Sequence, residues 1–127
     1  MKLSQSSLTA LLNKNAVELK FLRRRPMAGD QPTRRMLATN DTILLNSIEG
    51  RTALNFRPAT GQLKFNPQAK GLVLTWDIFM QDYRLVPCES VDIVSVIPTT
   101  PPDEFWKYFN TVLSKMTATD KMRFMDK

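Results

Sequence analysis

The chain has 127 residues, enough for one domain whose core buries roughly two thirds of the unfolded surface. Hydrophobic residues make up 43% and charged residues 24%, which excludes a disordered tail and a disulfide-dense scaffold. The sequence has no histidine and one cysteine, Cys88, which removes most catalytic and metal-site chemistry. We therefore expect a single folded domain, residues 1–127, that is not an enzyme and holds no metal or cofactor.

The positive charge is concentrated near the N-terminus. The 18 Lys and Arg exceed the 12 Asp and Glu by six. Residues 1–35 contain eight basic and two acidic side chains, and 8 − 2 = +6, so this segment carries the whole excess. A basic face attracts polyanions such as nucleic acid or anionic lipid headgroups, and the alternative is a solvated surface with no binding role.

The sequence contains no stretch that is typical of a membrane span or a signal peptide. Residues 71–76 form the longest uncharged apolar run, far short of a span. A lone cysteine agrees with a reducing compartment. These observations predict a cytoplasmic protein without a membrane partner.

The N-terminal third is predicted to form a helix and a β-hairpin. Residues 4–14 contain three leucines at helical spacing. From residue 16 the period changes to two, which places Val17, Leu19 and Phe21 on one face of a strand. Turn residues follow, and residues 34–39 return as a second strand. Five arginines should therefore meet at one hairpin end: Arg23, Arg24, Arg25, Arg34 and Arg35.

Residues 40–71 are predicted to be an insertion that contains a β-ribbon. The segments 54–58 and 63–67 are near-repeats that each end in proline, with a turn at Gly61 between them. Phe56 and Phe65 lie beside Arg57 and Lys64, and single-strand binders interleave aromatic and basic residues in this way. The alternative is that both rings pack in the core.

Three further strands and a helix complete the chain. Residues 72–79, 83–86 and 91–97 are rich in β-branched and aromatic residues, and their short connections predict antiparallel neighbours. Residues 101–116 are predicted to form a helix capped by Thr99 or Thr100. The element order predicts a mainly β fold with flanking helices. Residues 16–97 would form a small antiparallel SH3/Sm-like barrel, with the helix 4–14, the inserted β-ribbon within 40–71 and the C-terminal helix around it.

One group of side chains could line a pocket on the barrel surface. Trp76 and Asp77 are predicted to lie opposite Tyr83 and Arg84 on neighbouring antiparallel strands. This arrangement brings an acid, a base and two rings within reach of one another. The alternative is a structural salt bridge beside buried rings.

Several of these segments together resemble a known family. They are Val17–Phe21, Arg34–Thr39, Leu72–Ile78, Tyr83–Leu85 and Val91–Val96. The Trp76-Asp77 pair and the Tyr83-Arg84-Leu85 segment are the distinctive parts, and they are similar to the small WYL-related proteins common in bacteriophage genomes. The resemblance implies an Sm-like, SH3-type barrel that binds nucleic acid or a protein, is phage-encoded and self-associates through strand edges.

Two hypotheses for the function follow. The first is a non-enzymatic nucleic-acid-binding protein, with RNA or single strands slightly favoured over duplex DNA. Its contacts would come from the hairpin arginines, Arg57, Lys64, Phe56 and Phe65, because guanidinium groups bind phosphate and rings stack on bases. The alternative is a protein-interaction module that docks on a host enzyme or complex through the aromatic residues 105–109 of the C-terminal helix.

Overall fold

The computed structural model describes residues 4–23, 28–29, 32–58 and 67–125. Five helices are α1 (Gln5–Lys14), α2 (Thr42–Asn46), α3 (Ile48–Ala53), α4 (Pro102–Thr111) and α5 (Ala118–Met125), with short 3-10 turns η1 (Pro67–Lys70) and η2 (Leu113–Lys115). Five strands are β1 (Asn15–Leu22), β2 (Thr33–Thr39), β3 (Leu72–Asp77), β4 (Asp82–Pro87) and β5 (Asp92–Pro98). The five predicted strands and the predicted N-terminal helix are confirmed.

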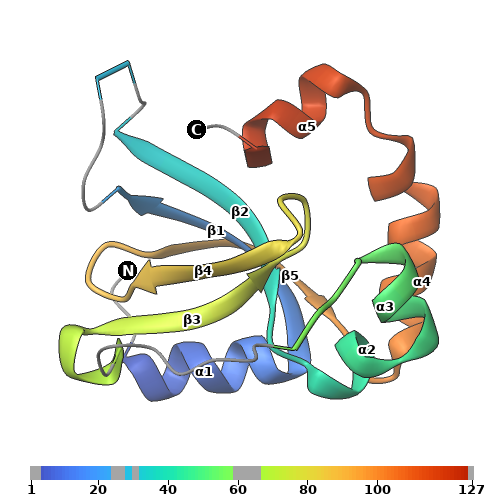
Figure 1. The fold of residues 1–127 in the computed structure, drawn as a ribbon, viewed down its shortest axis with the longest axis horizontal. Helices are drawn as coiled ribbons and strands as arrows, with labels where there is room; N and C mark the ends of the chain where they lie inside the picture. The colour runs from blue at the N-terminus through green and yellow to red at the C-terminus, as the bar shows by residue number, and fades with distance from the viewer. Residues whose placement is uncertain (1–3, 24–27, 30–31, 59–66, 126–127) are drawn as a thin grey trace.

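The strands form one antiparallel sheet in the order β4-β3-β2-β1-β5 (Figure 1). β1 pairs along most of its length with both β2 and β5, whereas β2 pairs with β3 only at Ala38↔Asp77 and Thr39↔Trp76. Within the described residues the sheet is open, with β4 and β5 at its edges. Closure into an SH3/Sm-like barrel is therefore unconfirmed, and the fold is a five-stranded antiparallel sheet with helices.

The sheet separates two apolar clusters. The predicted alternation in β1 is confirmed, because Val17, Leu19 and Phe21 are all buried in one cluster, beneath α1. The other cluster lies on the opposite face and contains Trp76 and Phe105 with leucines of α2 and η2. Figure 1 shows α1 along one side of the sheet and α2, α3 and α4 grouped at another.

The insertion differs from the prediction. Residues 42–53 form α2 and α3, and the predicted first ribbon strand, 54–58, has no regular structure. The second ribbon strand lies mostly outside the described residues. Asp41 and Ser47 cap the two short helices by accepting backbone N–H groups. Gly50 permits their close approach, because a Cβ there would lie 2.2 Å from the Leu44 carbonyl oxygen.

The C-terminal region also differs in detail. α4 ends at Thr111, and η2 and α5 follow, so the single predicted helix 101–116 is divided. Pro101 occupies the N-cap position of α4 without a side-chain hydrogen bond. The predicted cap Thr99 instead donates its hydroxyl to Asp41 at 2.5 Å. Helices hold more residues than strands, so the description as mainly β is wrong and the fold is mixed.

Candidate nucleic-acid interface

The β1–β2 hairpin brings its basic residues to one end of the sheet. The register pairs Phe21 with Arg34 and Leu22 with Thr33. The Arg23 N–H donates to the Pro32 carbonyl at 2.9 Å, so the hairpin continues past the two strands. Figure 1 shows β1 and β2 running together to an end of the molecule away from α2, α3 and α4. Arg24 and Arg25 belong to the hairpin connection and lie outside the described residues.

Arg34 points to the inner face of the hairpin. Its guanidinium donates to the Asp77 Oδ2 at 2.6 Å, and the side chains are 12% and 0% exposed. Phe21, its partner across the register, is buried in the same face. This ion pair links the hairpin to the end of β3. Arg34 is therefore a structural contact within the protein.

Asp77 is held by the turn that follows β3 as well as by Arg34. Its Oδ1 accepts the backbone N–H groups of Phe79 and Met80 at 3.1 and 3.0 Å. Burial raises the pKa of this carboxyl, and the Met80 N–H, the charges of Arg34 and Arg84 and the Phe79 N–H oppose the increase. The side chain therefore joins two hairpins at the cost of burying a carboxylate.

Arg35 lies on the outer face of the same strand. Its side chain is 35% exposed and 3.7 Å from Glu18. The residue directly opposite on β1 is Lys20, which is exposed. Like charges at directly opposed positions repel and destabilise a sheet. The outer face of the hairpin thus holds two cations at adjacent sites, with Glu18 as a carboxylate beside them.

The aromatic residues proposed for base stacking are separated by the structure. Phe56 is 7% exposed, and its ring meets Trp76 edge to face with centroids 5.0 Å apart. It lies in the core, as the alternative interpretation of the sequence proposed. Arg57, the next residue, is exposed. Lys64 and Phe65 lie outside the described residues.

The residues proposed for a surface pocket divide between the two faces of the sheet. Trp76 and Tyr83 are register partners whose rings pack edge to face at 5.1 Å. Asp77 binds Arg34, while Arg84 donates to Asp82 at 3.0 Å. These four residues do not converge on a common pocket. The salt bridge beside buried rings, the alternative interpretation, describes this region better.

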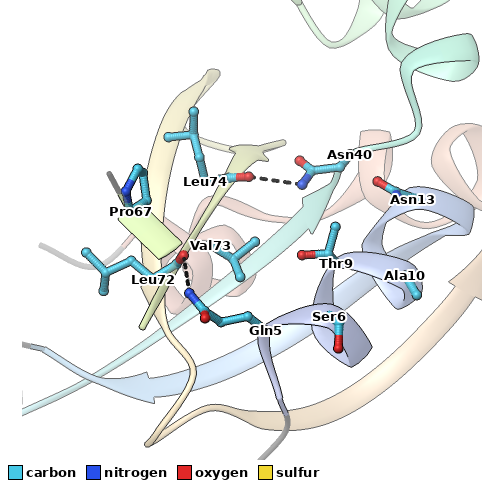
Figure 2. A pocket seen from close by; sticks show the side chains of 10 residues that line it. All are labelled: Gln5, Ser6, Thr9, Ala10, Asn13, Asn40, Pro67, Leu72, Val73 and Leu74. Carbon is cyan, nitrogen blue, oxygen red and sulfur yellow. Dashed lines mark hydrogen bonds between the residues drawn. The ribbon is translucent and has the colours of Figure 1, made fainter. Parts of the chain in front are cut away.

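A cavity of about 580 Å³ lies elsewhere, between α1 and β3 (Figure 2). Its lining is uncharged: Gln5, Ser6, Thr9, Ala10, Asn13, Asn40, Pro67, Leu72, Val73 and Leu74. The side-chain amides of Gln5 and Asn40 donate to the carbonyls of Leu72 and Leu74 at 3.2 and 2.9 Å. The sequence gave no signal for this site, because its residues come from four separate segments and form no motif.

Two structural searches narrow the chemistry of the described residues. Among the helices that the structure describes, none combines the length and apolar character needed to cross a bilayer. The same residues contain no group of three or more Asp, Glu or Cys side chains arranged to hold a metal ion.

Comparisons with protein-family models, curated proteins and solved structures found no match to this chain. The proposals below therefore depend on the residues and their geometry.

Proposed function

We propose that this protein binds nucleic acid without catalysing a reaction, and that the outer face and open end of the β1–β2 hairpin contact the phosphates. The observation that carries the proposal is the direct pairing of Lys20 with Arg35 across the two strands. This arrangement costs stability in the free protein. A phosphate between the two cations would relieve the repulsion, because it attracts both.

The charge of the hairpin supports the same conclusion. Residues 18–35 contain six basic and two acidic side chains, so their net charge is 6 − 2 = +4. Arg34 is bound to Asp77 on the inner face, which assigns the phosphate contacts to Lys20, Arg35 and the arginines at 23, 24 and 25. Arg57 is a further exposed cation in the insertion. Phe56 is excluded from base stacking by its burial among Trp76 and Tyr83.

The test is a binding titration with RNA, single-stranded DNA and duplex DNA at several salt concentrations. We expect affinity to fall as salt rises, with a log–log slope of about −0.7 per phosphate contact on single strands. The triple variant Arg23→Ala, Arg24→Ala and Arg25→Ala should reduce that slope by about two to three contacts.

A matched triple variant controls for net charge. Arg51→Ala, Lys107→Ala and Lys115→Ala remove three exposed cations from α3, α4 and η2 and leave the hairpin unchanged. This control should keep most of the salt slope. Equal losses in the two triple variants, or no binding to any probe at low salt, would show that the hairpin is not the site. The three probes also decide whether RNA and single strands are preferred.

The alternative of a protein-docking helix receives less support. Phe105 of α4 is fully buried, and the rings of Trp106 and Phe109 pack on it at 5.0 and 6.2 Å. Much of the aromatic surface of α4 therefore belongs to the second apolar cluster. The resemblance to small WYL-related barrels of bacteriophages, with its implied phage origin and self-association, stays a further proposal with the same nucleic-acid test.

A further inference from the structure

The cavity between α1 and β3 lies along an unpaired part of the β3 edge. β2 pairs with β3 only at residues 76 and 77, so Leu72 and Leu74 have no neighbouring strand on that side. The Ile78 N–H donates to the Leu37 carbonyl of β2, and strand alternation then points the backbone groups of residues 72, 74 and 76 the same way. α1 stands where a longer β2 would have continued (Figure 2).

Side-chain amides occupy positions that strand donors would otherwise hold. Gln5 donates to the Leu72 carbonyl and Asn40 to the Leu74 carbonyl, two acceptors spaced as successive acceptors along a strand edge. These amides satisfy the backbone of an empty site, because a buried carbonyl without a donor is costly. By alternation the Leu74 N–H faces the same cavity and offers a donor beside the two acceptors.

We propose that this cavity binds an extended, uncharged peptide segment, which adds to β3 as a short strand. A peptide offers N–H and C=O groups at the spacing of the β3 edge, and this mode of recognition depends on main-chain hydrogen bonds. The volume of about 580 Å³ is within the range of ligand sites. The lining contains no charged side chain, so a charged segment would lose solvation without gaining a partner.

The proposal is independent of nucleic-acid binding, because the cavity and the basic hairpin share no residue. It is tested with 15N-labelled protein and an uncharged pentapeptide that has blocked ends and alternating Ser, Val and Thr. We expect saturable chemical-shift changes at the backbone amides of residues 72–74 and at the side-chain amides of Gln5 and Asn40. The hairpin amides should not move. The absence of saturable shifts at these amides up to about 10 mM peptide, well beyond millimolar affinity, would overturn the proposal.

Two variants locate the site. Ala10 lines the cavity and is exposed on α1, so Ala10→Leu should fill the space while the helix is retained. This variant should lose peptide binding. Ala118→Leu makes the same substitution at an exposed position of α5, outside the cavity lining, and should bind normally. Equal binding by the two variants would place the peptide elsewhere.

Two further measurements test strand addition itself. Gln5→Ala removes an internal donor that competes for the Leu72 carbonyl, so peptide affinity should rise about fivefold. A peptide with N-methylated backbone amides cannot donate to the edge and should bind at least fivefold more weakly than the parent peptide. Weaker binding by Gln5→Ala, or equal binding of the methylated peptide, would contradict an added strand.

Discussion

Two buried aspartates, Asp41 after β2 and Asp77 after β3, perform the same local task with different partners. Each accepts two backbone N–H groups of the following turn: Ile43 and Leu44 for Asp41, and Phe79 and Met80 for Asp77. The third partner differs, because Asp41 accepts the Thr99 hydroxyl and Asp77 accepts the Arg34 guanidinium. The same turn motif therefore joins distant segments by a neutral contact in one place and by an ion pair in the other.

This difference reaches the proposed function. The ion pair of Asp77 removes one arginine from the basic hairpin and fixes the orientation of the hairpin against β3. The contact of Asp41 joins the start of α2 to the segment between β5 and α4 and touches no basic residue. A change at Asp77 should therefore affect both folding and nucleic-acid binding, and a change at Asp41 should affect folding alone.

The largest effect is expected for Asp77→Ala. The substitution removes the carboxylate that the buried Arg34 contacts and both turn hydrogen bonds, and breaking a buried pair costs about 3 to 5 kcal/mol of the free energy of unfolding. Urea denaturation measures the loss. Asp77→Asn keeps an oxygen for the turn N–H groups and should lose less. A loss under about 1 kcal/mol for Asp77→Ala would contradict this account.

Asp41→Ala should be the milder substitution. It removes a helix cap and the acceptor of the Thr99 hydroxyl, which together contribute about 2 kcal/mol. Thr99→Val separates the two contributions, because it deletes only the hydroxyl and should cost about 1 kcal/mol. Both values come from the same urea titrations. Nucleic-acid affinity of the folded protein should be unchanged in both variants, and a change would contradict the separation of the two regions.

The pH dependence of stability should also distinguish Asp77. Its pKa is raised above 3.8 by burial, so the folded state holds the proton more tightly than the unfolded chain. This contribution is complete below about 3.8 and is lost as pH rises through the folded-state pKa. We expect the free energy of unfolding of the wild type, relative to Asp77→Asn, to increase as pH falls from about 7 to about 4. A relative decrease over that range would contradict the raised pKa.

The sequence predicted the elements whose signals are local. The alternation of Val17, Leu19 and Phe21 located β1 and its buried face, because a half-buried strand imposes a period of two. Leu54 and Phe56 show the same alternation and are also buried, but they lie in irregular backbone that covers Trp76. Their pattern reports burial, and burial is common to strands and packed loops. The predicted ribbon failed for this reason.

The candidate site was predicted in position but not in detail. Strand alternation requires that adjacent arginines 34 and 35 face opposite ways, yet the inward one is decided by Asp77, 43 residues further along the chain. The short helices α2 and α3 were missed because their capping residues were taken as turn signals. Ile43 and Ile48 are more than 80% exposed there, which removes the apolar periodicity that marks longer helices.

The smallest effect on stability is expected for Arg35→Ala, and it gives the clearest contrast with Arg34→Ala. Arg35 is opposed by Lys20 and lies 3.7 Å from Glu18 at the surface, so repulsion and attraction nearly cancel and the free energy of unfolding should change by about 0 to 1 kcal/mol. Arg34→Ala leaves Asp77 in its buried site without the guanidinium and should cost about 3 kcal/mol. Nucleic-acid binding should show the reverse order, because Arg35 faces outward and Arg34 is held by Asp77. Urea denaturation and a titration of both variants against single-stranded nucleic acid at one low salt concentration measure the two quantities. If Arg34→Ala lost more affinity than Arg35→Ala while still folded, the inner face of the hairpin would be the binding face, and the ion pair to Asp77 would have to open when nucleic acid binds.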